Sequence, residues 1–258
     1  MLKITPIDAL QDNYIWLLRE TNHRGAIVVD PGEAKPVLET LTRGQLSLTA
    51  ILVTHHHWDH TNGIAELLKQ YPTAIVFGPA KEKVFGCKHF MQENDQTAIP
   101  NFSTQFKVLD IPGHTLGHIA YYGANALFCG DTLFTAGCGR IFEGTPEQMY
   151  QSLSKLAALP ATTKIYCGHE YTLANLKFAA HVEPNNTDTQ QRIKQVQQLR
   201  AQQLPSVPAT LMLELQTNPF LRCESPSIIS AVEYHIKKKL DNPVDVFAHL
   251  REWKNSFS

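Results

Sequence analysis

Short runs of apolar and β-branched residues recur through the first two thirds of the chain, separated by glycine, proline and polar residues. Runs of this length are too short for typical helices, and their continuous apolar character is typical of strands that are buried on both faces. The pattern predicts strands at residues 14–18, 26–30, 48–54, 74–77, 106–111, 118–122, 126–129 and 164–167.

Helical patterns lie between these runs and dominate after about residue 170. The segment TPEQ at 145–148 predicts a capping box with proline in the first helical turn, and TDTQ at 187–190 opens a second such pattern. We predict helices at residues 63–70, 145–159, 187–203, 226–240 and 243–257. The chain is therefore expected to be an α/β protein, with a sheet-containing domain at residues 1–170 and a small all-α domain at residues 171–258.

The overall composition argues against several classes of function. With 258 residues, of which 43% are hydrophobic, the chain is long enough for one large domain or for a domain with a smaller partner. The 23 Lys and Arg residues against 24 Asp and Glu residues lack the basic excess of a nucleic-acid-binding protein. The opening segment MLKITPIDALQDNYIWLLRE is interrupted by charges and a proline, so it predicts neither a signal peptide nor a membrane span. We expect a cytoplasmic monomer that binds neither nucleic acid nor a membrane.

The five cysteines are odd in number, scattered along the chain and never in a CxxC pair. This arrangement argues against a disulfide framework and against a thiolate zinc site. We therefore expect reduced thiols. Cys129 and Cys167 each lie two residues before a candidate metal ligand, and we assign both to packing.

Seven of the twelve histidines are concentrated in three short patches. The first is the heptapeptide THHHWDH at 54–60, and the others lie at 114–118 and at 169. Each patch, like the Gly-Asp pair at 130–131, follows an apolar run within a few residues. Since strand ends at one edge of a sheet converge in space, these segments can meet there. The sequence therefore predicts a metal site built from four distant segments.

The spacing within the first patch favours two adjacent ions over one. His55 and His57 are two residues apart, which directs both side chains the same way along an extended chain. So short a segment can hardly wrap four donors around a single ion, and we assign Asp59 and His60 to a second ion. The hypothesis is that His55, His57 and His114 hold one divalent ion, that Asp59, His60 and His169 hold the other, and that Asp131 bridges them at about 3.5–4 Å. These nitrogen and oxygen donors suit zinc, and also iron or manganese.

Several of these residues have simpler interpretations when each is taken alone. Asp59 can cap a helix and His114 can be a turn residue, but the joint pattern favours a metal site. His56 should face away from the ions, and His118 should be a structural histidine. Asp30 can either orient a ligand imidazole or cap the turn that follows it, and the sequence leaves both open.

Longer motifs carry a family resemblance that spans almost the whole chain. They are DNYIWLL at 12–18, THHHWDHTNG at 54–63, PGHTLGH at 112–118, GDTLFTAGCGRIFEGT at 130–145, CGHEYT at 167–172 and NPFLR at 218–222. With these motifs the chain resembles the metallo-β-lactamase superfamily and, within it, the hydroxyacylglutathione hydrolase (glyoxalase II) family.

The resemblance implies a fold and an activity. It implies an αββα sandwich with the binuclear site at one edge, followed by a helical domain that helps to bind glutathione, and it implies the same seven metal ligands. The implied reaction cleaves the thioester of S-2-hydroxyacylglutathione, with S-lactoylglutathione as the expected substrate. The products are glutathione and lactate, in the second step of methylglyoxal detoxification. Two cations would lower the pKa of the attacking water, and Asp59 and Asp131 would be the catalytic residues.

The resemblance also implies which residues contact glutathione: Arg140, Tyr171, Arg251 and Lys254. Phe142 stands where relatives can carry a tyrosine, so one hydrogen bond to the substrate would be missing. From the residues alone, Arg251 and Lys254 lie three apart on one helical face and would be interpreted as an exposed, solubilising pair.

Other functions stay open at this point. A lactonase or a persulfide dioxygenase of the same superfamily is the enzymatic alternative, although a single-iron dioxygenase would leave His60 and His169 unexplained. A non-catalytic, metal-stabilised glutathione-binding protein would tolerate a closed coordination shell, whereas catalysis needs an exchangeable position.

Overall fold

The computed structural model describes residues 2–21 and 23–257. The chain forms two compact units, of which the first comprises residues 1–110 and 117–130, and the second comprises residues 111–116 and 131–258. The predicted domain boundary at residue 170 stays a prediction.

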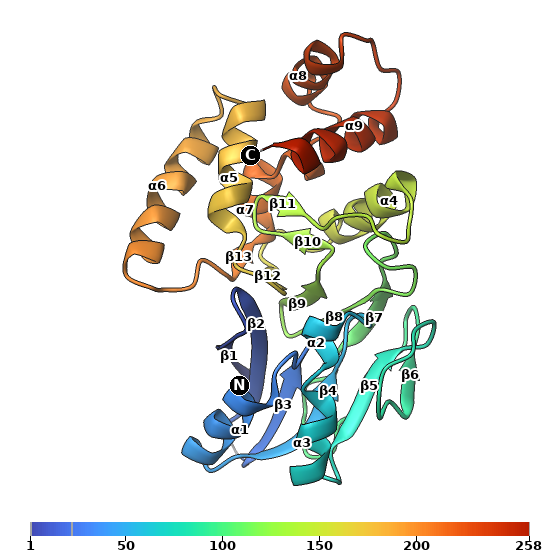
Figure 1. Ribbon diagram of the computed structural model, residues 1–258, viewed down its shortest axis with the longest axis vertical. Coiled ribbons are helices and arrows are strands. Elements are labelled where there is room, and N and C mark those ends of the chain that lie inside the picture. Colours follow the sequence, from blue (N-terminus) through green and yellow to red (C-terminus); the bar gives the residue numbers. More distant parts are fainter. Residues whose placement is uncertain (1, 22, 258) are drawn as a thin grey trace. The chain divides into compact units, whose positions relative to one another are not determined.

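The first unit contains a six-stranded sheet in the order β1-β2-β3-β4-β5-β6 (Figure 1). Strands β1 to β3 pair antiparallel, and strands β3 to β6 pair parallel. The strands are β1 Leu2–Ala9, β2 Asn13–Glu20, β3 Gly25–Val29, β4 Ser47–Leu52, β5 Ile75–Pro79 and β6 His89–Met91. Because Val29 lies opposite Leu52 in parallel register, the chain leaves β3 and β4 at the same edge of the sheet.

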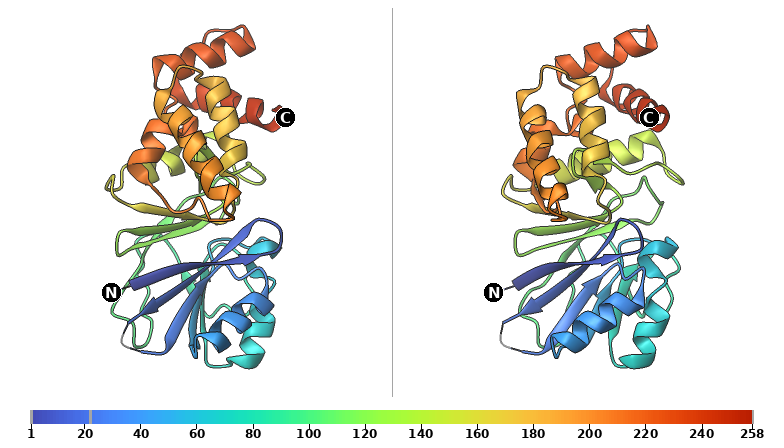
Figure 2. Two further views of the ribbon diagram at one scale, coloured as in Figure 1. Left: turned by 90° about the vertical axis from the view of Figure 1, so that its left-hand side faces the viewer. Right: turned by 60° about the vertical axis from the view of Figure 1, so that its left-hand side comes forward.

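The central strands of this sheet, β2 to β5, are mostly buried. Helices α1 Ala34–Arg43 and α3 Ile64–Gln70 cover one face, where Val37 and Leu67 pack with Val28 in a single apolar cluster (Figure 2). At the sheet edge, Ile119 N donates to Thr54 O at 2.9 Å and Tyr121 Oη donates to Val53 O at 3.0 Å. Both donors belong to a second, antiparallel group of strands, which is β7 Lys107–Asp110, β8 Ile119–Gly123 and β9 Ala126–Gly130.

The second unit is mainly helical. Its helices are α4 Pro146–Ala157, α5 Thr172–Val182, α6 Thr187–Ala201, α7 Leu211–Thr217, the 3-10 helix η1 Pro219–Leu221, α8 Pro226–Ile236 and α9 Pro243–Ser256. Its short strands are β10 Leu133–Phe134 and β11 Gly137–Cys138, which form a hairpin, and β12 Lys164–Cys167 with β13 Ala209–Thr210. The rings of Phe178, Phe220 and Phe247 pack in series, with centroids 6.0 and 5.9 Å apart. None of the described helices is long and apolar enough to cross a membrane.

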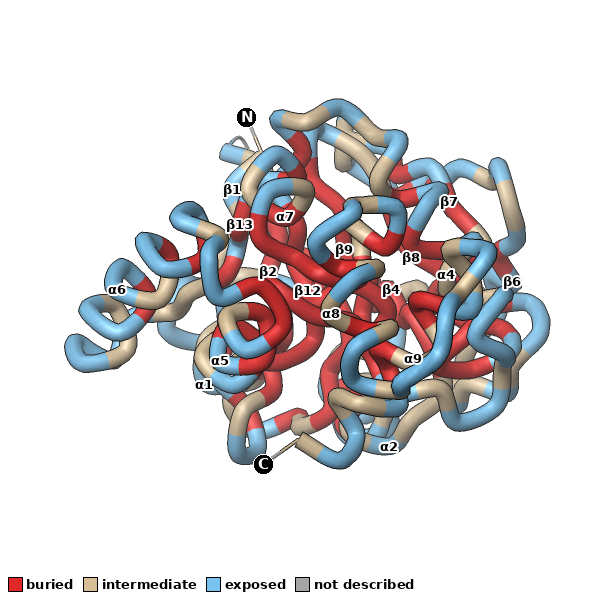
Figure 3. The backbone as a smooth tube through the Cα atoms, turned by 90° about the horizontal axis from the view of Figure 1, so that it is seen from above, coloured by how far each residue is buried: buried red, intermediate tan, exposed pale blue. Residues whose placement is uncertain are grey.

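All predicted strands and helices are present, with ends that shift by up to four residues. Helix α4 has the predicted capping box, because Thr145 accepts from Gln148 N and the Gln148 side chain accepts from Thr145 N. The predicted cap of α6 was wrong: Asn186 caps the helix by accepting from Thr189 N, and Thr187 is already the first helical residue. This helix is mostly exposed, as its polar sequence predicts (Figure 3). Helix α8 ends at Ile236, because the next residue, Lys237, has a φ of 56°.

Several elements carry no signal that the pattern analysis could detect. Strand β1 contains Pro6 and pairs with β2 at the edge of its sheet, where proline is tolerated. Helix α1 has no side-chain cap at Glu33. Helix α5 is apolar on several sides, so its sequence lacks a clear amphipathic stripe.

The capping box at α4 generates a stability prediction. Replacing Thr145 with Ala removes the acceptor for Gln148 N, and we expect the free energy of unfolding to fall by about 0.5–2 kcal/mol. Urea denaturation measures this change. Gln151→Ala on the exposed side of the same helix is the control and should change the stability by less than about 0.5 kcal/mol. Equal effects of the two substitutions would show that the box contributes nothing specific.

Candidate metal centre

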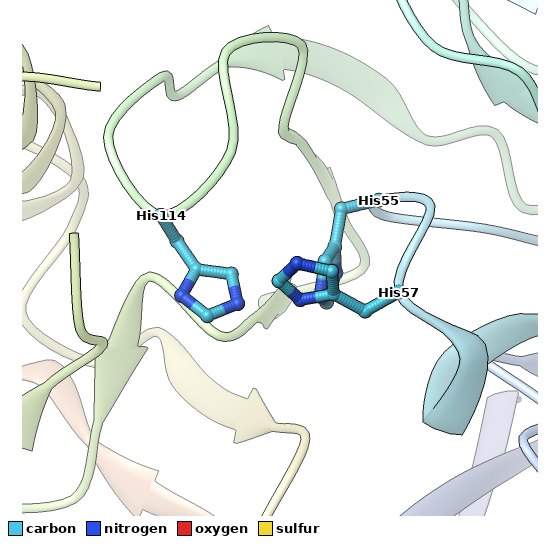
Figure 4. A group of neighbouring side chains, drawn as sticks. All are labelled: His55, His57 and His114. Carbon is cyan, nitrogen blue, oxygen red and sulfur yellow. The ribbon is translucent and has the colours of Figure 1, made fainter. Parts of the chain in front are cut away.

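The histidine-rich loop follows β4 and enters the short helix α2, Trp58–Thr61. His55 is fully buried and His57 is half-buried. Their rings meet edge to face at an interplanar angle of 78°, with His55 Nε2 3.1 Å from His57 Nδ1 (Figure 4). Figure 4 also draws His114, which belongs to the second unit. The expectation that His55 and His57 point the same way is confirmed.

The spacing of donor atoms in this loop suits a metal ion. Two ligands at 2.0–2.1 Å from a tetrahedral zinc ion lie roughly 3.3 Å from each other. The His55–His57 nitrogen pair is separated by 3.1 Å, and Asp59 Oδ2 lies 3.5 Å from His60 Nε2. The first unit therefore presents two neighbouring donor pairs, as the two-ion hypothesis requires of the segment 54–60.

Asp30 controls the orientation of two of these imidazoles. Its carboxylate accepts from Thr54 N at 2.8 Å and from Thr54 Oγ1 at 2.7 Å, and it lies 3.1 Å from His60 Nδ1. Thr54 Oγ1 in turn lies 3.0 Å from His55 Nδ1. Because the carboxylate can only accept, His60 carries its proton on Nδ1, and the hydroxyl, which donates to Asp30, accepts from His55 Nδ1. The Nε2 lone pairs of both rings are therefore directed away from Asp30. Of the two interpretations of Asp30 that the sequence left open, the structure supports the one in which it orients a ligand imidazole.

Two further contacts fix Asp59. Asn13, at the start of β2, donates through Nδ2 to Asp59 Oδ2 at 3.1 Å and to Asp59 O at 3.2 Å. A Cβ at Gly32 would lie 1.8 Å from Asp59 O, so only glycine allows this approach. No local sequence pattern marks Asn13 as a functional residue. Its only signal was its place in the DNYIWLL motif.

The two remaining histidines of this region behave as expected. His56 points to Glu82, with Nδ1 3.0 Å from the carboxylate, and Glu82 also accepts from Gly117 N at 3.0 Å. His118 is buried, and its ring stacks on His55 at 4.5 Å. Both residues therefore hold the loop rather than face the predicted ions.

The second unit contributes a compact group of three buried residues. Asp131 Oδ2 lies 3.3 Å from His169 Nε2 and 3.6 Å from His114 Nε2. His114 Nδ1 donates to Arg140 O at 2.8 Å, which leaves Nε2 as its ligand atom. The same carboxylate oxygen thus lies close to His114 and to His169, which are assigned to different ions. Both separations also match the distance between two donors that bind one cation.

A cavity of about 390 Å³ opens beside this group within the second unit. It is lined by His114, Asp131, Phe134, Cys138, Arg140, Phe142, Tyr171, Ala174, Asn175, Arg251, Lys254, Asn255 and Phe257. All four residues implied for glutathione binding are therefore in one cavity, with two of the predicted metal ligands. The wall carries three basic side chains, those of Arg140, Arg251 and Lys254, and no ion pair joins any of them to a carboxylate within residues 2–21 and 23–257.

The cations differ in how they are held. Arg251 is only 6% exposed, donates through Nη1 to Cys138 O at 2.7 Å and lies 5.1 Å above the Phe220 ring. Burial lowers the pKa of Lys254, and the positive charges of Arg251 and Arg140 lower it further. The interpretation of Arg251 and Lys254 as an exposed, solubilising pair was therefore wrong. A group of like charges without an acidic partner favours an anionic ligand.

The aromatic residues of the cavity lie against the metal-site histidines. The ring of Tyr171 stacks on His169 with centroids 4.7 Å apart and an interplanar angle of 6°. Phe142 meets His114 edge to face at 5.3 Å and is otherwise exposed. Tyr171 can thus contact a ligand in the cavity and fix the His169 ring at the same time.

The cysteines are packing residues. None of the five forms a disulfide, and four of them are buried. Burial raises the pKa of Cys138, and it raises that of Cys167 to about 12. Thiols with such pKa values stay protonated near neutral pH, which argues against a thiolate ligand or nucleophile here.

Comparisons with known proteins cover the whole chain. A family model for the metallo-beta-lactamase superfamily matches residues 10–169, and a model described as hydroxyacylglutathione hydrolase C-terminus matches residues 170–257. The chain is 49% identical to a hydroxyacylglutathione hydrolase from Nitrosomonas eutropha and 54% identical to one from Methylobacillus flagellatus. Each alignment spans 257 residues and covers 100% of both chains.

Solved structures agree on the fold. ETHE1 from Myxococcus xanthus aligns with a TM-score of 0.68 at 23% identity, over 98% of this chain and 90% of that one. The B3 metallo-beta-lactamase BLEG-1 aligns with a TM-score of 0.64 at 23% identity, over 86% of this chain and 99% of that one. These matches confirm the predicted α/β fold class with its helical C-terminal region. The superfamily match and the histidine and carboxylate groups together indicate divalent metal binding.

The position of Asp30 generates a prediction about metal affinity. In Asp30→Asn the amide nitrogen cannot accept a hydrogen bond, so either Thr54 or His60 loses its partner. We expect zinc affinity to fall roughly 10- to 100-fold, measured by competition with a chelating dye. Asp110→Asn, the same change at a carboxylate that pairs with the exposed Lys81, is the matched control. An affinity of Asp30→Asn equal to that of the control would contradict the assignment.

Proposed function

We propose that this chain, which belongs to the hydroxyacylglutathione hydrolase family of the metallo-β-lactamase superfamily, hydrolyses thioesters of S-2-hydroxyacylglutathione. The observation that carries the proposal is the cavity of the second unit, which combines Asp131 and His114 with the cations Arg140, Arg251 and Lys254. Glutathione carries two carboxylates, so a near-neutral protein needs such a local group of cations to bind it. S-Lactoylglutathione is the proposed substrate.

We assign seven residues to two divalent cations. His55, His57 and His114 would hold one, Asp59, His60 and His169 would hold the other, and Asp131 would bridge them. The donor separations within each unit, 3.1 to 3.6 Å, support this assignment. The chemistry supplied by the cations, when bound, is Lewis-acid activation of water and of the thioester carbonyl.

The chain's own residues would bind, orient and move protons. Arg140, Arg251 and Lys254 bind the carboxylates of glutathione, and Tyr171 closes the wall of the cavity beside His169. Asp59, held by Asn13, is the group that can accept a proton from the attacking water. The leaving group is a thiol, a far stronger acid than an alcohol, so no protein acid has to protonate it.

The enzymatic alternatives receive less support. A single-iron persulfide dioxygenase would use only part of the donor set, whereas Asp131 Oδ2 lies near both His114 and His169. A lactonase does not require the group of three cations. A non-catalytic, metal-stabilised glutathione-binding protein would use both the cations and the donor pairs, and only the absence of turnover would distinguish it from a hydrolase.

Three finer assignments belong to the same proposal. Zinc is the proposed metal, because the donors are imidazole and carboxylate groups in pairs that fit tetrahedral separations. The cytoplasm is the proposed compartment, because five cysteines without a disulfide suit a reducing environment. The proposed active form is a monomer, since the four residues that we assign to glutathione line a single cavity of one chain.

A thioester-cleavage assay tests the proposed reaction. The zinc-loaded protein should hydrolyse S-lactoylglutathione, lose the activity after chelation and recover it with two equivalents of zinc per chain, as measured by elemental analysis. Asp131→Asn should retain glutathione binding but lose turnover, because the bridging carboxylate is gone. Turnover that survives both chelation and this substitution would contradict the proposal.

Arg140 provides a separate test of the substrate pocket. Its side chain is exposed at the cavity, whereas Arg251 also holds Cys138 O, so Arg140→Gln is the cleaner variant. We expect KM to rise roughly 10- to 100-fold, the equivalent of about 1.5–3 kcal/mol for a charged hydrogen bond, with kcat within about twofold. Arg43→Gln, an exposed arginine of the first unit, should leave KM unchanged. An unchanged KM in Arg140→Gln would remove Arg140 from the site.

A further inference from the structure

The segment from Asp131 to Arg140 joins the two halves of the proposed active site. Asp131 is a proposed metal ligand, and Cys138 and Arg140 line the cavity. Between them, β10 and β11 form a hairpin with Thr135 and Ala136 in its turn. The position of this hairpin therefore decides how the proposed glutathione pocket lies relative to Asp131.

Buried side chains of the helical region hold the turn. Glu214 of α7 is fully buried and accepts from Ala136 N at 2.8 Å. Asn175 of α5 donates to Thr135 O at 3.1 Å. Ala136 has a φ of 55°, a conformation that costs a residue with a side chain some energy, so external contacts are needed to keep it there.

Asn218 makes the largest number of these contacts. Its Nδ2 group donates to Phe134 O at 3.1 Å, to Gly137 O at 2.9 Å and to Glu214 at 3.1 Å. Its Oδ1 atom accepts from Phe220 N at 3.1 Å. Asn218 is fully buried and opens the NPFLR motif, to which the proposed reaction assigns no role.

The rest of the network holds the Glu214 side chain in place. Arg192 of α6 is 3% exposed and pairs with Glu214, and it also donates to Thr217 Oγ1. A buried ion pair of this kind contributes little net stability, since desolvation offsets its attraction, but it fixes geometry. The carboxylate is thus a rigid acceptor for the hairpin.

We propose that Asn218 and Glu214 are positioning residues that set the Cys138–Arg140 wall of the substrate cavity through the β10–β11 hairpin. The inference rests on the proposed function and deepens it. Neither residue lines the cavity, so their effect on the substrate passes through the backbone that they hold. At the far end of the same segment, Arg251 donates to Cys138 O, which extends this support to a proposed glutathione ligand.

Two variants test the proposal. Asn218→Ala removes the donors to Phe134 O and Gly137 O. In Glu214→Gln, which keeps the side-chain volume, the amide oxygen should stay with the Arg192 guanidinium, so Ala136 N and Asn218 lose the acceptor that Oε2 provides. In both we expect a rise of about tenfold in KM and in the inhibition constant of glutathione, with kcat and zinc content within about threefold of the wild type. Hydrogen exchange at the amides of residues 133–140 should become at least about tenfold faster.

Glu183→Gln is the matched control. Glu183 is a buried carboxylate of the same unit that pairs with Arg222 and accepts from Ser227, away from the hairpin. It should lower the thermal midpoint without changing KM or exchange at residues 133–140. If Asn218→Ala fails to fold, Glu214→Gln decides the question.

The outcomes separate the two proposals. Unchanged KM and exchange in both variants, or equal changes in Glu183→Gln, would show that the network is merely structural and would overturn the positioning role. Absence of turnover in the wild type would instead overturn the proposed function. Glutathione affinity and hydrogen exchange would then still decide whether Asn218 and Glu214 position the cavity wall.

Discussion

The carboxylate of Asp30 is the contact on which the histidine loop depends. It accepts from the backbone and the hydroxyl of Thr54 and from His60 Nδ1. Through that hydroxyl it also determines which ring nitrogen of His55 carries the proton. A histidine can coordinate a metal only through a nitrogen that carries no proton, so these contacts decide which atom of each ring is available. In the second unit, Arg140 O has the same effect on His114. Ligand geometry is thus set by acceptors that do not contact the proposed ions.

The sequence predicts which donor residues lie together within each unit. Motif spacing identified donor residues that the structure pairs within each unit, such as His55 with His57 and Asp131 with His169. Short apolar runs likewise predicted the buried strands, because this pattern can be recognised in the sequence without knowing which residues are in contact in the fold. The joint set of seven ligands, which draws on both units, stays a prediction.

Other features could not be predicted, because they arise only from contacts between residues far apart in the chain. Asn13 lies 46 positions from Asp59, and Asn218 lies 84 positions from Phe134. Neither has a local pattern that distinguishes it from an ordinary polar residue. Arg251 resembled a solubilising surface residue, because helical spacing does not reveal that its guanidinium is buried over an aromatic ring. The family resemblance assigned Arg251 to glutathione, but its burial follows only from the packing of α9 in the second unit.

The central claim is that two divalent cations share these residues, with Asp131 between them. Anomalous diffraction at the zinc edge from crystals of the zinc-loaded protein tests it most directly. The account predicts two peaks at full occupancy, about 3.5–4 Å apart, with the Asp131 carboxylate in contact with both. A single peak, or two peaks of which either lies beyond the reach of Asp131, would contradict it.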